Sequence, residues 1–349
     1  MVEHGIVDVA RVAGVSTATV SRALRGLPNV TDDTRQRVLR AAADLGYVAS
    51  PSAASLASGR TRTIGLLTPW VTRWFFSNVI EGAERRLRAR DFDVLLSIFR
   101  DDDESGLRFD PDALRRRVDG VLVVGMPLRG PELAALEALE RPLVFIGPGA
   151  RGHVTVGIDD VAAARTATAH LVGLGHRRIA HLTGSVRDDA PSSPAVRRTE
   201  GWQLALADAG FEPDPGLLQH VDAESGLLHT GHFGLEGGRH SLHQLLDRRP
   251  DVTAVFAASD EIAMGVLLGA RERRLRVPDD LSVAGVDGHE LSGLLGLTTV
   301  VQDALAQGSE AAELVLRLAA GETVRGEWLH PTRLVVRGST AAPGAHARP

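Results

Sequence analysis

Two short runs of apolar residues at helical spacing open the chain, within residues 6–24. Each run predicts one amphipathic helix, because every third or fourth residue falls on the same helical face. Gly14 lies between the runs and can take the positive φ that a tight turn requires. Ser16 is placed to cap the second helix. The inward positions are Val9, Ala10 and Ala13 in the first run and Val20 and Leu24 in the second.

The second of these helices carries polar side chains on the face away from its apolar stripe. Arginine can bind guanine through two hydrogen bonds, and hydroxyl and methyl groups suit phosphates and thymine edges. We therefore interpret the pair as a DNA-binding helix-turn-helix, with an ordinary helical hairpin as the alternative. The candidate DNA contacts in this segment are Ser16, Thr17, Ala18, Thr19, Ser21, Arg22 and Arg25.

A third helix is predicted for residues 31–45, capped by Thr31 and ended by Gly46. Small residues then dominate positions 50–59, a composition that is typical of a flexible linker. The alternative is a short helix that orders only on DNA and inserts Leu56 into the minor groove. The candidate DNA contacts in this segment are Ser52, Ala53 and Leu56.

From Thr63 onward, short apolar runs alternate with helical stretches. Buried strands joined by helices indicate a doubly wound α/β architecture with parallel sheets, in which ligands bind at the carboxyl ends of the strands. The predicted strands are 64–67, 92–98, 121–124, 143–146, 154–158, 179–182, 255–258 and 283–286. The predicted helices are 77–90, 161–174, 199–209, 238–247, 261–273 and 304–320. Residues 341–349 are expected to be disordered.

The composition is that of an ordinary globular chain, with 44% hydrophobic and 24% charged residues among 349. Cysteine is absent, which excludes disulfides, thiol catalysis and cysteine-based metal centres. Residues 1–61 carry seven arginines and five acids, or +2, so the remainder of this −5 chain has −7. A basic head on an acidic body is expected if only the head meets nucleic acid. Neither a secretory signal nor a transmembrane run is expected.

Two motifs allow other interpretations. Residues 147–152 match the G-x-G-x-x-G pattern of dinucleotide sites, but a strand is predicted after them, where phosphate binding needs a helix. The chain also has two H-x-x-H pairs, His229 with His232 and His240 with His243. We interpret them as part of a solvated loop and helix face, with a metal site as the alternative. Hydrolase and phosphate-transfer signatures are missing, so no catalytic residue, cofactor or metal is predicted.

A series of motifs, in order along the chain, resembles the LacI/GalR family of transcriptional regulators over about residues 6–340. They are DVARVAGVSTATVSRAL at 8–24, V-T-x-x-T-R at 30–35, LGY at 45–47, GRTRTIGLLTP at 59–69, VDGVLV at 118–123, HLVGLGHRRIAHLTG at 170–184, EGW at 200–202, TAVFAASDEIAMG at 253–265, RVPDDLSVAGVDG at 276–288, LTTVVQD at 297–303 and LVVRGST at 334–340.

The resemblance implies a helix-turn-helix domain at 1–48, a hinge helix or linker at 49–61 and an effector-binding core at 62–340. The core is expected to resemble periplasmic sugar-binding proteins, with two α/β subdomains that close around a ligand. The first subdomain is expected to take residues 62–160 and 291–322, and the second residues 161–290 and 323–340.

The effector is expected at the strand ends of this core. Trp74 and Phe75 follow the first core strand and are candidate aromatic walls for a sugar ring or a base. The polar contacts that the resemblance implies are Arg198, Asp159, Asp160, Ser259 and Asp287. Because Asp159, Asp160 and Asp260 lie just before predicted helices, helix capping is the alternative role for these acids.

The resemblance further implies a cytoplasmic, homodimeric repressor that binds palindromic double-stranded DNA and a sugar-like effector. Ser50 and Ala54 depart from the family pattern in the hinge, and Ser259 and Gly288 depart from it in the cleft. These departures leave the hinge contacts and the identity of the effector open. The alternative is a small-molecule-binding protein whose DNA-binding head has decayed.

Overall fold

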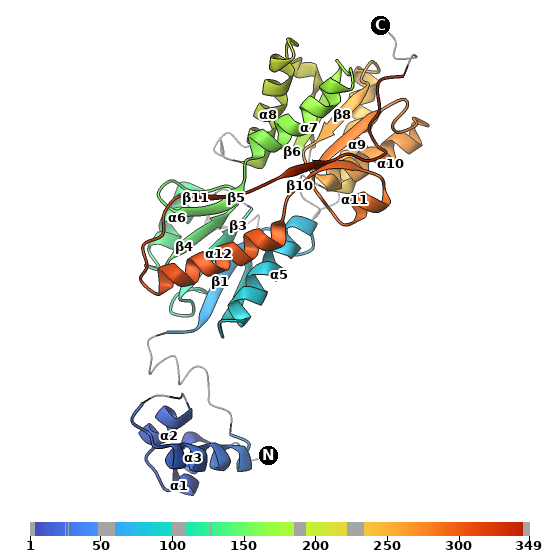
Figure 1. Cartoon of the computed structure of the whole chain (residues 1–349). Helices are drawn as coiled ribbons and strands as arrows, with labels where there is room; N and C mark the ends of the chain where they lie inside the picture. The colour runs from blue at the N-terminus through green and yellow to red at the C-terminus, as the bar shows by residue number, and fades with distance from the viewer. Residues whose placement is uncertain are drawn as a thin grey trace. The chain divides into compact units, whose positions relative to one another are not determined.

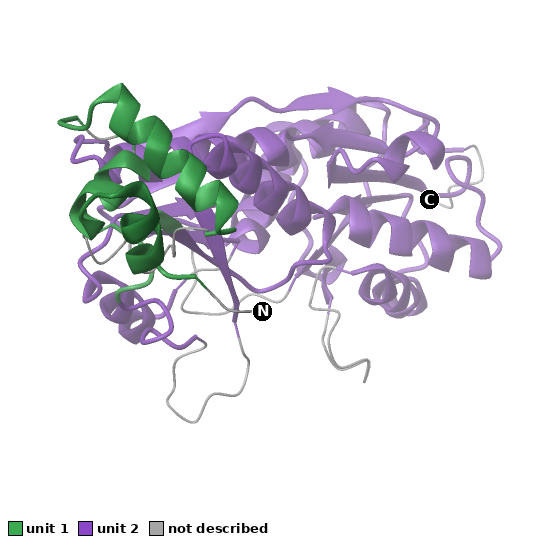
Figure 2. Ribbon diagram, turned by 90° about the horizontal axis from the view of Figure 1, so that it is seen from below, with its two compact units in different colours: residues 1–63, 116–119 green, residues 64–115, 120–349 purple. Residues whose placement is uncertain are grey.

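The computed structural model describes residues 4–24, 26, 28–47, 60–99, 109–125, 128–184, 193–221 and 234–344. The chain forms two compact units, residues 1–63 with 116–119 and residues 64–115 with 120–349 (Figure 2). Four predicted DNA contacts lie outside the described residues: Arg25, Ser52, Ala53 and Leu56. Within the described ranges, no helix is long and apolar enough to cross a membrane.

The three helices predicted for the head are confirmed (Figure 1). They are α1 (Ile6–Ala13), α2 (Thr17–Leu24) and α3 (Asp32–Asp44). Val9, Val20 and Val38 are fully buried in one small core to which each helix contributes. Gly14 takes φ 67° after α1, where the left-handed conformation lets the chain turn into α2. Leu24, predicted to face inward, is only half-buried.

The larger unit contains two six-stranded sheets, which confirms the predicted α/β architecture. The first sheet has the order β11-β5-β4-β3-β1-β2, and the central strands β3, β4 and β5 are buried on both faces. Helices α5 and α12 lie side by side against it (Figure 1). The elements of this first half are β1 (Thr63–Thr68), α5 (Trp74–Arg88), β2 (Asp93–Ile98), β3 (Gly120–Val124), α6 (Gly130–Glu137), β4 (Leu143–Ile146), β5 (Val154–Ile158), α12 (Ala304–Ala319) and β11 (Glu327–His330).

The second sheet has the order β12-β10-β9-β8-β6-β7. Its pairs are parallel except β12, which runs antiparallel to β10. Helices α7 and α8 pack as one pair and α9 and α10 as another. The elements of this second half are α7 (Asp160–Gly173), β6 (Ile179–Gly184), α8 (Pro194–Asp208), a short 3-10 helix (Pro215–Leu217), β7 (Leu218–Val221), α9 (Leu235–Arg248), β8 (Ala254–Ala257), α10 (Asp260–Glu272), β9 (Ser282–Asp287), α11 (Leu291–Leu294), β10 (Thr298–Val301) and β12 (Arg333–Val335).

The crossovers between the halves differ from the predicted boundaries. Residues 291–301 were expected in the first subdomain, yet β10 pairs with β9 in the second sheet. Residues 323–330 were expected in the second subdomain, yet β11 pairs with β5 in the first sheet. The sequence of a short strand does not indicate which sheet it joins, because pairing depends on which strand has an unpaired edge beside it in the folded chain.

The expected disorder of residues 341–349 is wrong for residues 341–344, which the structure describes; residues 345–349 lie outside it. The carbonyl of Ala341 accepts hydrogen bonds from His176 at 2.9 Å and from Ser282 at 3.1 Å. Ser282 Oγ in turn accepts the Ala341 N–H at 3.1 Å. Polar groups of distant elements therefore order a segment whose composition alone suggests a tail.

Candidate functional site

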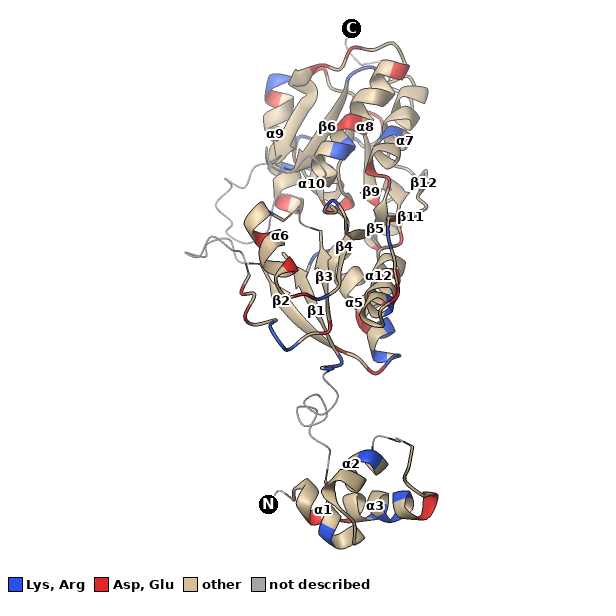
Figure 3. Cartoon of the chain, turned by 90° about the vertical axis from the view of Figure 1, so that its left-hand side faces the viewer, with Lys and Arg blue, Asp and Glu red and all other residues tan. Residues whose placement is uncertain are grey.

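Five of the residues predicted to contact DNA lie on α2, and a sixth, Ser16, directly precedes this helix. Ser16 Oγ accepts the Thr19 N–H at 3.1 Å and lies 2.9 Å from Thr19 Oγ1, so Ser16 caps α2 as predicted. The exposed positions are Thr17, Ala18 and Arg22, and the half-buried positions are Thr19 and Ser21. Figure 3 marks the charged positions of the head helices. The exposed positions of α2 offer a guanidinium, a hydroxyl and a methyl group to a partner.

In the second half, Arg198 of α8 lies at the carboxyl ends of β8 and β9, with its side chain only 7% exposed. Its Nε donates to Asp160 Oδ1 at 2.8 Å, and its Nη1 donates to the carbonyl of Ala258. The same Nη1 lies 3.9 Å from Asp287 Oδ1. Burial lowers the pKa of Arg198, but the Asp160 and Asp287 carboxylates outweigh burial and raise it. Three predicted effector contacts thus meet in one buried group, the acid–arginine cluster of Asp160, Arg198 and Asp287.

Asp287 is the unusual member of the cluster. Burial raises the pKa of its carboxyl to about 8, although Arg198 opposes the rise. Its φ is 137°, a backbone conformation that non-glycine residues rarely adopt and that recurs at functional sites. A buried carboxyl that titrates near neutrality can either donate or accept a hydrogen bond, which suits a ligand rich in hydroxyl groups.

A chain of buried amides links Asp287 to the first half. Gln302 Nε2 donates to Asp287 Oδ1 at 2.8 Å, and Gln307 Nε2 donates to Gln302 Oε1 at 2.9 Å. Gln302 lies on a crossover and Gln307 on α12, and both are almost fully buried. Sequence reasoning missed both residues, although the position of Gln302 directly after a strand end is a signal that could have found it.

The remaining predicted polar contacts are engaged within the fold. Asp159 accepts a backbone N–H in the first turn of α7 at 3.0 Å, and Ser259 does the same for α10 at 3.2 Å. Both therefore act as helix caps, the alternative role that the sequence suggested for Asp159 but not for Ser259. The buried Asp260 connects α10 to the loop after β9 and to β10. Its carboxylate accepts from the N–H groups of Gly288 and His289 and from the hydroxyls of Ser292 and Thr299.

The two predicted aromatic walls differ in their surroundings. The Phe75 ring packs edge-on against Phe76, 5.4 Å between centroids, and contributes to the core of the first half. Trp74 lines a cavity of about 350 Å³ together with Gln302 and residues of the crossovers. Trp74 also lies 5.7 Å from the ring of His289, between centroids, in the second half. Both side chains are partly buried against the core of the first half, and of the two Trp74 lines a cavity with Gln302, the residue whose amide donates to Asp287.

Sequence reasoning also missed His181, which is completely buried on β6. Its ring stacks on Phe256 at 4.7 Å and on Trp202 at 5.8 Å, and burial lowers its pKa to about 3. Nδ1 lies 3.0 Å from the Phe256 carbonyl, which makes it the protonated nitrogen. A neutral histidine among aromatic rings therefore lies beneath α8, the helix that carries Arg198. A single histidine within an apolar run does not indicate that its ring will be buried and stacked between two aromatic side chains.

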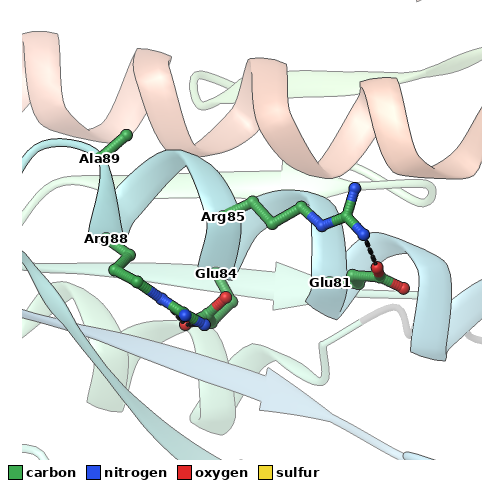
Figure 4. A pocket seen from close by; sticks show the side chains of 5 residues that line it. All are labelled: Glu81, Glu84, Arg85, Arg88 and Ala89. Atoms are coloured by element: carbon green, nitrogen blue, oxygen red, sulfur yellow. Dashed lines mark hydrogen bonds and ion pairs between the residues drawn. The ribbon is translucent and has the colours of Figure 1, made fainter.

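A second cavity, of about 470 Å³, lies on the outer face of α5. Figure 4 shows its lining: Glu81, Glu84, Arg85, Arg88 and Ala89. Glu81 pairs with Arg85 and Glu84 with Arg88, each four residues apart on the same helix. Ion pairs between exposed neighbours on one helix describe a solvated surface, so we assign no ligand to this cavity.

The two motifs with other interpretations also have structural outcomes. Strand β5 follows residues 147–152, as predicted, so no helix N-terminus is available there for a phosphate. His243 lies between Glu272 at 2.7 Å and Arg273 at 2.8 Å, and His240 bonds to Gln244. His229 and His232 lie outside the described residues. Within the described part of the chain, no group of three potential ligands is arranged to hold a metal ion.

Comparisons with known proteins agree with this organisation. Residues 5–50 match the family described as bacterial regulatory proteins, lacI family, and residues 168–340 match a periplasmic binding protein-like domain. Catabolite control protein A of Priestia megaterium is 30% identical over 340 residues, which cover 96% of this chain and 98% of that protein. The HTH-type transcriptional repressor CytR of Escherichia coli K12 is 34% identical over 342 residues, with 96% of each chain covered.

Solved structures are similar over the whole length. A lac repressor dimer bound to operator and the anti-inducer ONPF has a TM-score of 0.82 at 28% identity, with 98% of this chain and all of that chain covered. A complex of the transcriptional regulator CelR with cellobiose has a TM-score of 0.69 at 31% identity, with 96% and 99% covered. Head, core and their order along the chain therefore all match, and the chain belongs to the lacI family of bacterial regulatory proteins.

Proposed function

We propose that this protein is a transcriptional repressor that binds a palindromic operator as a homodimer and is controlled by a sugar or sugar derivative. One observation carries the proposal: a helix-turn-helix with an exposed arginine-bearing face and a buried acid–arginine cluster occur in the same chain. The first has groups suited to base edges, and the second has groups suited to hydroxyls.

For DNA binding, Arg22 is the residue we assign to a guanine, with Thr17 and Ala18 beside it on the exposed face of α2. Two heads would occupy successive major grooves, and the symmetry of a dimer would require a palindromic site. The names of the relatives, including the CytR repressor and the operator-bound lac repressor, support this assignment.

For effector binding, the acid–arginine cluster provides both hydrogen-bond donors and acceptors. Arg198 would donate to ring or hydroxyl oxygens, Asp160 and Asp287 would accept from hydroxyls, and Trp74 would stack on an apolar sugar face. Trp74 lines a cavity of about 350 Å³ with Gln302, whose amide donates to Asp287, and a cavity of this volume is within the size range of small-molecule sites. The similarity to a CelR–cellobiose complex supports a sugar as the ligand class.

Exposed apolar side chains support self-association of the core. Leu291, Leu294 and Leu295, in and directly after α11, are 43%, 85% and 49% exposed. On β2 of the first half, Leu96 and Ile98 are 43% and 46% exposed. Such side chains favour a partner surface over water, and a second copy of this chain is the partner we propose. The lac repressor neighbour is itself described as a dimer.

We further propose that the protein acts by binding without catalysis and that it works in the cytoplasm, where its DNA lies. The alternative is a small-molecule-binding protein with a decayed head. The packed three-helix core of the head and the exposed Arg22 favour the repressor.

The test is selection of genomic fragments by the purified protein at a stated, near-physiological salt concentration. Enrichment of one palindromic site supports the repressor, and the neighbouring genes then suggest which sugars to assay by thermal shift. Diffuse, salt-sensitive retention of all fragments would instead support the decayed head. Turnover of any sugar by the purified protein would contradict the absence of catalysis.

A further inference from the structure

Helix α5 begins without a cap from its own preceding residue. The residue before its first turn is Arg73, whose side chain makes no capping hydrogen bond, because a guanidinium cannot accept one. The first N–H groups of a helix have no partner within the helix and carry its positive dipole end. The start of α5 lies in the first half, where Trp74 lines a cavity together with Gln302, the residue that donates to Asp287 of the acid–arginine cluster.

The missing cap comes from the other half of the core. Glu261, in the first turn of α10, accepts the Trp74 N–H with its Oε1 at 3.3 Å. Its Oε2 lies 3.6 Å from a guanidinium nitrogen of Arg73. The two side chains are only 17% and 10% exposed. One carboxylate therefore satisfies a helix N-terminus and a buried cation that both belong to the opposite half.

The electrostatics favour this contact while the halves are together. Burial lowers the pKa of Arg73, and Glu261 opposes that effect. The first turns of α5 and α10 both present positive dipole ends, and Glu261 is close to both. Separating the halves would leave the α5 terminus uncapped and Arg73 without this counter-charge. Burial is the main cause of the raised pKa of Asp287, and the negative charge of Glu261 adds a smaller contribution, so Glu261 is within electrostatic reach of the cluster.

We propose that Glu261 is a positioning residue that holds the two halves of the core closed, by capping α5 from α10, and thereby controls access to the acid–arginine cluster. We name this contact of Glu261 with Arg73 and Trp74 the cross-half cap. The Trp74–His289 ring contact lies at the same junction and adds apolar surface to it. The regulatory consequence rests on the proposed function, whereas closure itself is a property of the isolated protein.

The absence of cysteine allows a direct measurement of closure. Spin labels at Ala134→Cys on α6 and Ala207→Cys on α8, both exposed, report the separation of the halves by pulsed electron resonance. Glu261→Ala removes the cap and the charge, and Glu261→Asp keeps the charge but shortens the reach by one methylene. Both should raise the ratio of open to closed molecules by about five- to tenfold, since a lost helix cap has an effect of that size.

The matched control is Glu322→Ala, which breaks the Glu322–Arg317 pair within the first half and should leave the distances unchanged. If Glu261→Ala fails to fold, Glu261→Asp and Arg73→Met still test the contact. Distance distributions of the Glu261 variants that match the unsubstituted labelled protein would overturn the proposal. Neither DNA nor sugar enters this experiment, so its failure leaves the repressor assignment standing, and a failed operator selection leaves the cross-half cap standing.

Discussion

Replacement of Arg198 by methionine tests whether charge holds the acid–arginine cluster together. Methionine keeps part of the apolar stem but removes the guanidinium from Asp160, Ala258 and Asp287. The side chains of Arg198 and Asp160 are 7% and 14% exposed, so water has little access to replace the lost partner. Removal of one member of a buried ion pair typically costs about 3–5 kcal/mol, and we expect the free energy of unfolding to fall by about 3 kcal/mol at pH 8.

The size of this loss should increase with pH. The pKa of Asp287 is about 8 with Arg198 present, and it rises further when that positive charge is removed. Above pH 8 the folded variant then retains a proton that the folded wild type has released, while both unfolded chains have lost it. The stability difference therefore grows by up to about 1.4 kcal/mol per pH unit as the pH increases through 8.

Urea unfolding followed by tryptophan fluorescence measures the effect. Trp202 is a suitable probe in the second half, because it is 1% exposed and its indole N–H donates to the Ile179 carbonyl at 3.1 Å. Arg165→Met is the matched control, since its pair with Asp208 is about half exposed and should contribute below about 1 kcal/mol. Equal stability of the two variants at pH 7 and pH 9 would refute the reasoning. The Arg198 variant should also lose its sugar response while it keeps nearly all of its operator affinity.

Three further predictions concern the head and the dimer. Ser16→Ala should destabilise α2 by about 1 kcal/mol, seen as faster hydrogen exchange of its amides in the full chain, and unchanged exchange would contradict the cap. Arg22→Ala should cost about 1–3 kcal/mol on the selected operator and relax one base preference, whereas an equal loss on random DNA would make Arg22 a phosphate contact. Leu294→Glu should shift the sedimenting species from dimer toward monomer, and an intact dimer would exclude α11 from the interface.

Local patterns were sufficient for much of the fold. The apolar spacing of Val9 and Val20 and the turn at Gly14 predict the helix-turn-helix, because a helical face and a left-handed turn depend on nearby residues only. Strands β4 and β5 were predicted with their exact bounds, since strands buried on both faces are rich in apolar and β-branched residues. The sequence missed helices α6 and α11 and strands β7, β10, β11 and β12, because segments of three to eight residues give too short a pattern to distinguish from loops.

Motifs at the ends of strands and the starts of helices were sufficient to predict that Asp160, Arg198 and Asp287 contribute to one site. The sequence could not show which of two neighbours, Asp159 and Asp160, caps the helix and which pairs with Arg198. Asp159 has an extended backbone and caps α7, whereas Asp160 is the first residue of the helix and its side chain reaches Arg198.

Tertiary structure alone decided the contacts between segments far apart in the chain. Three features depend on such contacts: the pairing of β10 with β9, the burial that raises the pKa of Asp287 and the capping of α5 by Glu261. In none of them does the local sequence around one residue indicate its partner. Glu261 and Trp74 are 187 positions apart, and neither residue type marks a cap between them. Pairing between strands, loss of water around a side chain and contacts between distant residues depend on how separate elements pack. Sequence patterns therefore predicted the elements but not these interactions.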